Sequence, residues 1–259
     1  MNGIRHFLLA LQFFTRVPVT GRLARWVGYS PQMLRASAAH FPAIGYLVGA
    51  VGAAVFVGAL AWWPPAVAAV LSTIVTILLT GAFHEDGLAD VADGLGGSPD
   101  RERALEIMRD SRIGAFGAIA LVLALALKLA LLAALAGQGS MAAWIGIVAA
   151  HVLSRLAPLA VMRALPYVGG AGGKAKPMAE SVSGGAIGIA VLWTLPVVVA
   201  LGWAHGAGHT AALLSAAALA TLVLGRWFRA RLQGFTGDAL GATQQVCELA
   251  IYLALVARP

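Results

Sequence analysis

Long apolar runs separated by short polar segments dominate the sequence. A mostly apolar run of about 20 residues is long enough to cross the hydrocarbon core of a bilayer as a helix. The pattern predicts about seven such spans. They lie at roughly 38–63, 66–84, 113–136, 140–161, 186–204, 209–225 and, shorter than the rest, 244–257. Between the first two, the pair Trp62-Trp63 precedes Pro64-Pro65, which is typical of an interfacial aromatic belt followed by a helix-breaking turn.

We expect one all-α domain over residues 1–259, a polytopic integral membrane helical bundle. The apolar segment Phe7–Phe14 is too short to span a bilayer and is followed by no small-residue cleavage site. It is therefore predicted to form an N-terminal interfacial or re-entrant helix rather than a signal peptide. Glycines four residues apart favour close helix packing, with a merely Gly/Ala-rich composition as the alternative. Two such pairs are Gly45/Gly49 and Gly184/Gly188.

Composition supports a membrane protein. Hydrophobic residues make up 60% of the chain and charged residues 11%, and the mean hydropathy is +0.84. Soluble domains have about 25% charged residues. The net charge of +7 is not accompanied by the aromatic and basic groove of a nucleic-acid-binding protein, so no nucleic acid is expected as a partner. A single cysteine, Cys247, excludes an internal disulfide.

The basic residues alternate between the connections of the predicted spans. Of the 18 Lys and Arg residues, all but Lys128, Arg155 and Arg258 precede the first span or follow spans two, four and six. The other connections contain none: about 64–65, 137–139 and 205–208. The positive-inside rule therefore places the N-terminus and the basic connections in the cytoplasm.

The acidic residues gather on the same predicted side. All 11 Asp and Glu residues except Glu248 lie in three cytoplasmic connections, at about 85–112, 162–185 and 226–243. A transporter usually carries ionisable groups along its spans as a pathway. The observed distribution favours an enzyme whose active-site loops open to the cytoplasm.

The segment from Phe83 to Gly94 is the most acidic part of the chain. Asp86, Asp90 and Asp93 are spaced i, i+4, i+7, so a helix would place all three on one face. Like charges so close repel each other, and an all-oxygen ligand set suits Mg²⁺ or Mn²⁺. We therefore predict a divalent-metal site, with a solvated acidic helix end as the alternative. His84 and Glu85 are secondary candidates, since Glu85 points about 100° away from Asp86 on a helix.

Asp110, Ser111 and Arg112 stand just before the predicted span 113–136. The first amides of a helix are unpaired there, and the helix dipole favours an anion. Arg112 beside those amides favours the binding of a phosphate. For Asp110 and Ser111, a purely capping role remains open.

Two glycine-rich connections carry further candidates. Asp238 lies among three glycines, which lets the backbone approach a ligand closely, although a flexible turn is the alternative. Lys174 and Lys176 follow Gly169–Gly173 in a segment that lacks the spacing of a Walker A motif. That segment is compatible with a lid over a phosphorylated substrate and equally with a disordered loop.

Two basic residues are predicted to lie inside the membrane. Arg155 is about two turns from the cytoplasmic end of its span, where it is placed to reach a substrate phosphate or to pair with Asp86 or Asp238. Lys128 is near the middle of its span and is expected to snorkel or to form a structural pair rather than to act in catalysis.

Carboxylates on adjacent helical turns, facing basic groups at a cytoplasmic opening, indicate metal-dependent phosphoryl transfer. The chain also resembles the cobalamin-5′-phosphate synthases, the adenosylcobinamide-GDP ribazoletransferases. The resemblance runs from about residue 4 to 257. It is carried by Gln12–Val19, Phe41-Pro42-x-x-Gly45, Phe83–Gly94, Met108–Gly114 and Gly237–Ala242.

The resemblance implies a late step in assembling the nucleotide loop of cobalamin. A ribose hydroxyl of α-ribazole, or of its 5′-phosphate, would attack the corrinoid-side phosphorus of adenosylcobinamide-GDP and release GMP. It also implies a need for Mg²⁺ and a place in the bacterial cytoplasmic (inner) membrane. The oxygen ligand set leaves Mn²⁺ open as an alternative metal. Further expected partners are the lipid bilayer and, as open options, a second copy of the chain or other cobamide-assembly enzymes.

The expected site combines three groups of residues with two secondary candidates. The predicted metal ligands are Asp86, Asp90 and Asp93, the catalytic carboxylates are Asp110 and Asp238, the substrate-binding residues are Ser111, Arg112, Arg155, Lys174 and Lys176, and the secondary candidates are His84 and Glu85. The sequence Asp-x-x-Asp-Gly at 90–94 also resembles CDP-alcohol phosphotransferases, but their Ala-Arg and second Asp pair are missing. A lipid enzyme of that kind is the first alternative, and a transporter is the second.

Overall fold

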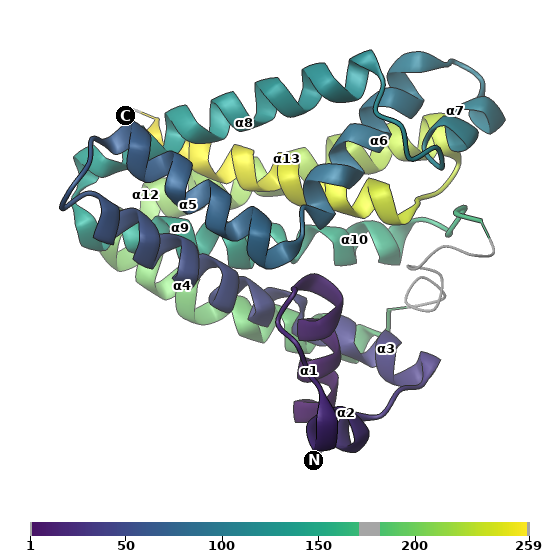
Figure 1. Ribbon diagram of the computed structural model, residues 1–259, viewed down its shortest axis with the longest axis horizontal. Helices are drawn as coiled ribbons and strands as arrows, with labels where there is room; N and C mark the ends of the chain where they lie inside the picture. The colour runs from purple at the N-terminus through teal and green to yellow at the C-terminus, as the bar shows by residue number, and fades with distance from the viewer. Residues whose placement is uncertain (1, 171–181, 258–259) are drawn as a thin grey trace.

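The computed structural model describes residues 2–170 and 182–257, and this part of the chain is almost entirely helical (Figure 1). The helices are α1 (Asn2–Phe14), α2 (Gly21–Val27), α3 (Pro31–Ser37), α4 (Phe41–Ala59), α5 (Pro65–Thr80), α6 (Phe83–Gly97), α7 (Arg101–Ile107), α8 (Ala115–Leu135), α9 (Ser140–Ser154), α10 (Ala157–Ala164), α12 (Gly184–Leu232) and α13 (Gly237–Val256). The predicted all-α fold is confirmed.

Within the described residues, five helices are long and apolar enough to span a membrane, or six if α5 and α6 together form one span. One of the five, α12, has 49 residues and breaks at Gly206, whose φ of 82° is not helical. Its first arm ends beside α9, where His205 Nε2 lies 3.2 Å from Ala142 O. Its second arm ends at the opposite end of the bundle, where Arg231 donates to Ser98 O. The two arms correspond to the fifth and sixth predicted spans.

A sharp bend separates α5 from α6. The two helices are bent by 89° at Gly81 and Ala82, which have φ values of 69° and 59°. A Cβ on Gly81 would overlap the guanidinium of Arg16, whose amide donates to Leu79 O. The predicted span 66–84 was therefore wrong at its C-terminal end, because the helix stops at Thr80 and the acidic segment begins a separate helix.

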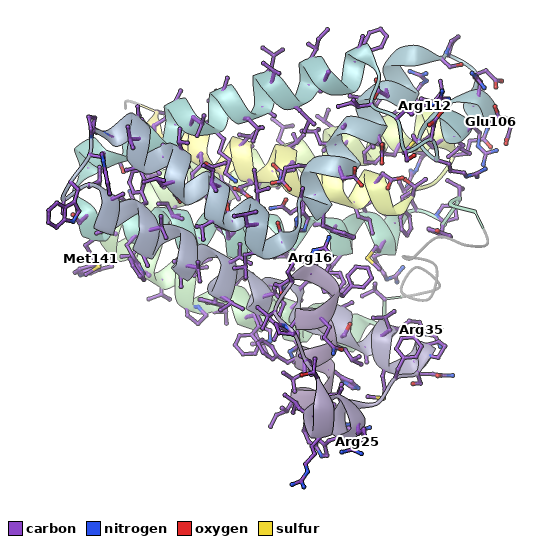
Figure 2. All side chains as sticks on the ribbon, viewed as in Figure 1. Arg16, Arg25, Arg35, Glu106, Arg112 and Met141 are labelled. Atoms are coloured by element: carbon purple, nitrogen blue, oxygen red, sulfur yellow. The ribbon has the colours of Figure 1, made fainter. Side chains whose placement is uncertain are left out.

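The bundle has one strongly charged end. Glu106 and Arg112 lie at the end formed by α7 and the last turns of α6, and Met141 lies at the other end (Figure 2). The connection before α9 and the C-terminal turn of α13 meet at the Met141 end, where Gln138 donates to Leu255 O. This arrangement agrees with the predicted alternation of basic and uncharged connections.

Close glycine packing is confirmed for one of the two predicted pairs. A Cβ on Gly45 would lie 2.4 Å from His151 O, and one on Gly49 would lie 2.8 Å from Val148 Cα. Larger residues at these positions would separate α4 from α9. Around Gly184 and Gly188 no atom of the described residues lies within 4 Å of a Cβ, so the alternative, a merely Gly/Ala-rich composition, holds for that pair.

The N-terminal helices α1, α2 and α3 lie beside the spans and project from the side of the bundle (Figure 1). The buried face of α1 includes Leu9, Leu11 and Phe14. Phe14 packs edge-on against Phe41 at the start of α4. The predicted N-terminal helix is present, and it braces the part of the bundle where α4 begins and α5 bends into α6.

Candidate functional site

A cleft of about 280 Å³ opens at the charged end of the bundle and is lined by residues of α6, α7, α13 and the segment after α10. Asp86 of α6 and Asp238 of α13 line this cleft, together with Arg109 after α7 and Tyr167 after α10. Four segments that are far apart in the sequence thus place polar side chains in one hollow. We call it the α6–α13 cleft.

Glycines allow α6 and α13 to approach closely beside this cleft. A Cβ on Gly87 would lie 2.8 Å from the carbonyl oxygen of Asp238 and 3.0 Å from its Cα. A Cβ on Gly241 would lie 3.3 Å from His84 O. At the start of α13, Thr236 accepts a hydrogen bond from the amide of Ala239 and fixes the first turn, which carries Asp238.

Negative charge accumulates around the cleft. Asp86 is exposed, Asp90 is half-buried, and the charge of Asp90 is repelled by those of Asp238, Asp86 and Asp93. Within the described residues, no three His, Cys, Asp or Glu side chains form a group that could hold a metal ion alone. Mg²⁺ is commonly held by one or two carboxylates, waters and substrate phosphates, so Asp86 and Asp90 fit such a shared site.

Asp93 forms hydrogen bonds to the start of α8, which the i, i+4, i+7 spacing did not predict. Its Oδ2 accepts a hydrogen bond from the amide of Gly114 at 2.7 Å, and its Oδ1 accepts one from the amide of Gly117 at 2.8 Å. The first amides of the span 113–136 were predicted to bind an anion. In the structure, the anion that they bind is the Asp93 carboxylate. Because both oxygens of Asp93 accept hydrogen bonds from the start of α8, Asp93 does not join Asp86 and Asp90 as a third free metal ligand.

The contact between Asp93 and α8 predicts that Gly117→Ala lowers stability. The new Cβ would lie 2.3 Å from Asp93 Oδ2 and 2.9 Å from Ala89 O. We expect the substitution to cost about 1–3 kcal/mol, the usual effect of overpacking. Thermal unfolding in detergent measures this, with Gly188→Ala as the control because a Cβ there has no neighbour within 4 Å in the described part of the chain. Equal melting temperatures for the two variants would contradict this role of Asp93.

Two of the candidates that stand just before α8, Asp110 and Arg112, face a different hollow. Asp110 and Arg112, together with Asp93, line a separate surface depression of about 580 Å³ on the side of α7 and the start of α8. Arg112 Nη2 lies 2.6 Å from Asp110 Oδ2, and the guanidinium lowers the pKa of Asp110 to about 2. So low a pKa makes Asp110 a poor proton acceptor at neutral pH. The structure does not bring Asp110, Ser111 or Arg112 into the α6–α13 cleft.

Arg109 and Tyr167 are cleft residues that the sequence analysis did not select. Burial raises the pKa of Tyr167, the charge of Asp238 acts in the same direction, and Arg109 opposes both. The Tyr167 hydroxyl therefore keeps its proton at neutral pH and can donate a hydrogen bond. Arg109 belongs to the stretch Met108–Gly114 that predicted phosphate binding, but only the path of the chain after α7 shows that Arg109, and not Arg112, enters the cleft.

The connections predicted at 162–185 and 226–243 meet at the cleft. The amide of Val168 donates to Phe235 O and the amide of Phe235 donates to Pro166 O, both at 2.9 Å. A Cβ on Gly234 would lie 2.4 Å from Pro166 O, so this pairing needs a glycine. The connection predicted at 226–243 is mostly helical and reduces to residues 233–236. Lys174 and Lys176 lie outside the described residues.

The remaining candidates are buried away from the cleft. His84 stacks on Phe14, with ring centroids 5.7 Å apart. Arg155 donates to His151 O at 2.8 Å and does not line the cleft. Of its two expected roles, the pairing with Asp86 or Asp238 is therefore wrong, and contact with a substrate phosphate stays a prediction. The physical reason is that Arg155 sits at the break between α9 and α10, where it lines a separate cavity with Gly241 and Gln244 of α13.

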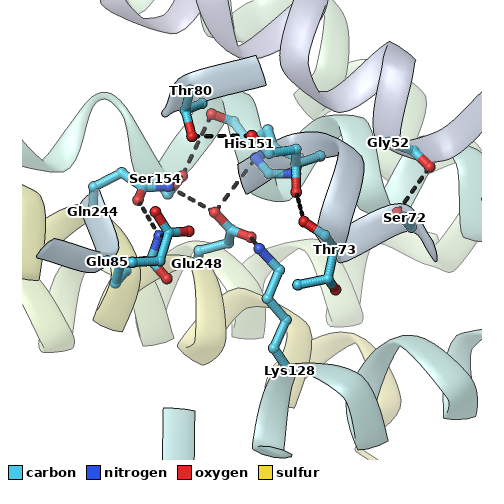
Figure 3. A network of polar contacts seen from close by, with 12 residues as sticks. Gly52, Ser72, Thr73, Thr80, Glu85, Lys128, His151, Ser154, Gln244 and Glu248 are labelled. Atoms are coloured by element: carbon cyan, nitrogen blue, oxygen red, sulfur yellow. Dashed lines mark hydrogen bonds and ion pairs between the residues drawn. The ribbon is translucent and has the colours of Figure 1, made fainter. Parts of the chain in front are cut away.

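Glu85 and Lys128 also point into the interior. Glu85 Oε1 accepts a hydrogen bond from Gln245 at 3.1 Å, which confirms that Glu85 turns away from Asp86. Lys128 Nζ lies 2.7 Å from Glu248 Oε1, as the predicted structural pair requires (Figure 3). The interior of the bundle therefore contains a polar network that the sequence analysis had not described.

Comparison with known proteins shows one family over almost the whole chain. The family described as cobalamin-5-phosphate synthase matches residues 6–256. An adenosylcobinamide-GDP ribazoletransferase of Polaromonas sp. (strain JS666) is 55% identical, with 97% of this chain and 96% of that protein aligned. Proteins of the same name from Shewanella amazonensis and Vibrio cholerae are 44% and 39% identical, over 96% and 97% of this chain and 94% and 93% of their own lengths. No solved structure matches the chain.

Proposed function

The chain belongs to the cobalamin-5-phosphate synthase family of transferases, and we propose that the α6–α13 cleft joins ribazole to adenosylcobinamide-GDP. The observation that supports this most directly is the meeting of Asp86, Asp238, Arg109 and Tyr167 in one cleft. Carboxylates, a guanidinium and a hydroxyl donor are the groups that a phosphoryl transfer between a hydroxyl and a pyrophosphate requires.

Each polar residue of the cleft has a role in this proposal, and so has Asp90, one turn after Asp86 on α6. Asp86 and Asp90 would hold Mg²⁺, which when bound would neutralise charge on the pyrophosphate. Arg109 binds a phosphate oxygen, and Tyr167 donates a hydrogen bond to the substrate. Asp238 accepts the proton of the attacking ribose hydroxyl. A bond forms between the ribose oxygen and the corrinoid-side phosphorus, the bond from that phosphorus to the bridging oxygen breaks, and GMP leaves.

We further propose that the cleft faces the cytoplasm from the bacterial inner membrane, because the basic connections lie at its end of the bundle. In spheroplasts, an impermeant maleimide should label a cysteine at Met141, which is 62% exposed at the opposite end. Cysteines at the exposed Glu102 and Gln233 should react only in inverted vesicles. Labelling of Glu102→Cys in sealed spheroplasts would contradict the proposed orientation.

The activity itself is tested with the purified protein in lipid, supplied with adenosylcobinamide-GDP, α-ribazole and Mg²⁺. We expect GMP and the joined corrinoid to appear in equal amounts on chromatography, and neither to appear after chelation of the metal. Uptake of a substrate into liposomes with no GMP formed would contradict the proposal and favour transport.

A further inference from the structure

A pair of opposite charges lies in the interior of the bundle, away from the cleft. Lys128 of α8 and Glu248 of α13 are 2.7 Å apart, and their side chains are only 4% and 1% exposed (Figure 3). Both belong to helices that are apolar and long enough to span a membrane. A charged side chain inside the bilayer is costly and is usually found where it has a function. Because a buried ion pair often adds no net stability over apolar residues, its presence needs another reason.

The pair continues into a chain of hydrogen bonds toward α6. Glu248 Oε2 accepts from Gln244 at 2.7 Å, and Gln244 Oε1 accepts from Gln245 at 3.1 Å. Gln245 also donates to Glu85 Oε1 at 3.1 Å. Lys128 is thereby linked through α13 to Glu85, which immediately precedes the cleft residue Asp86.

A second branch fixes the same helix to α9. Gln244 Nε2 donates to Ser154 Oγ at 2.9 Å, and His151 Nδ1 lies 3.4 Å from Glu248 Oε2. Ser154, Gln244 and Glu248 are each at most 1% exposed. The network therefore holds the middle of α13 between α8, α9 and α6, and its contacts with those three helices are lost if α13 slides or rotates.

Helix α13 carries both the network and a cleft residue. Asp238 is in its first turn, and the carbonyl of Asp238 lies against Gly87 of α6. A helix of 20 residues moves as a rigid element, so a shift at Glu248 is transmitted to Asp238.

We propose that Lys128 and Glu248 are positioning residues, whose ion pair sets the depth and rotation of α13 and so holds Asp238 opposite Asp86. This inference rests on the proposed function of the cleft. Neither residue lines the cleft, so neither is expected to contact substrate.

The test compares Lys128→Met, which removes the charge, with Lys128→Arg, which keeps it. We expect Lys128→Met to lower kcat per folded molecule by about tenfold or more with KM changed by less than about threefold, and Lys128→Arg to stay within about threefold of the parent. Ser72→Ala is the control, because it removes a buried hydrogen bond to Gly52 O that lies outside the network (Figure 3). That control should alter stability without altering kcat.

A second measurement does not depend on activity. Spin labels at the exposed positions Gly97 of α6 and Leu253 of α13 report the distance between these helices. The distance distribution should shift or broaden in Lys128→Met and remain as in the parent in Lys128→Arg and Ser72→Ala. If the parent releases no GMP, the proposed function fails while the distance measurement still tests the positioning role.

An unpaired Glu248 could prevent Lys128→Met from folding. In that case Lys128→Met/Glu248→Gln, which leaves no buried charge unpaired, takes its place. We expect this variant to fold, with a lowered kcat and an altered distance distribution. Parental kcat and an unchanged distribution in a folded variant without the ion pair would overturn the proposal.

Discussion

Asp86→Asn is expected to lower the rate of GMP release by at least about 10²-fold, because it removes the most exposed negative charge of the α6–α13 cleft. The substitution keeps the size of the side chain, so the protein should fold and insert normally. Raising the Mg²⁺ concentration should recover part of the loss, since Asn remains an oxygen ligand without the charge. Initial rates at several Mg²⁺ concentrations measure both effects.

Glu106→Gln provides the matched control for this variant. Glu106 lies on α7, with a side chain 60% exposed, and it lines the other hollow beside Asp110. Glu106→Gln removes one negative charge from the same end of the bundle as Asp86→Asn does. We expect it to change the rate of GMP release by less than about threefold. If both variants lose activity equally, the effect of Asp86→Asn comes from the overall charge of the surface rather than from the cleft.

Asp238→Asn is expected to lower turnover by about 10²–10⁴-fold, the range for loss of a general base. Asparagine cannot accept the ribose proton, and for the same reason added Mg²⁺ should not recover the rate. The amide can still take part in the contact with Thr236, whose hydroxyl lies 3.3 Å from Asp238 Oδ2, so the first turn of α13 should remain in place. Single-turnover kinetics measure the chemical step without product release.

Asp110→Asn is the comparison for Asp238→Asn. Both carboxylates were predicted as catalytic, but only Asp238 lies in the cleft, and Asp110 is paired with Arg112. We expect Asp110→Asn to change turnover by less than about threefold, as for other exposed ion pairs. A large loss in Asp110→Asn with a small loss in Asp238→Asn would move the chemistry to the hollow beside α8.

The arrangement of the spans could be predicted because a helix that crosses a bilayer needs an apolar run of about 20 residues, which is easily recognised in the sequence. Apolar runs of helical length gave α4, α8, α9 and both arms of α12, whose break at Gly206 falls in the uncharged connection predicted at 205–208. The end of α5 could not be placed, because the apolar run continues through Gly81 and Ala82. Only their left-handed backbone conformation ends the helix.

The acidic face of α6 could also be predicted, but not the separate surroundings of its members. Spacing places Asp86, Asp90 and Asp93 on one face, and their mutual repulsion agrees with this. Periodicity along one helix does not show what packs against each turn. Asp93 meets the start of α8, whose amides at Gly114 and Gly117 take its oxygens, whereas Asp86 opens into the cleft.

The buried network was beyond prediction for a similar reason. Lys128 is a single charged residue in one apolar segment, and Gln245 and Glu248 belong to another, about 120 residues later. No local pattern relates Lys128 to either of them. Their partnership depends on the rotation of α8 and α13 about their own axes, which the packing of the whole bundle decides. Arg109 and Tyr167 were missed in the same way, because loop geometry alone brings them to Asp238.

The central claim is that the α6–α13 cleft, and not the hollow beside α8, is the place of phosphoryl transfer. Electron paramagnetic resonance of Mn²⁺ added with adenosylcobinamide-GDP tests it most directly. We predict a substrate-dependent bound-Mn²⁺ signal in the parent protein that is weakened or lost in Asp86→Asn and retained in Asp110→Asn. A signal that survives Asp86→Asn and disappears in Asp110→Asn would contradict the account.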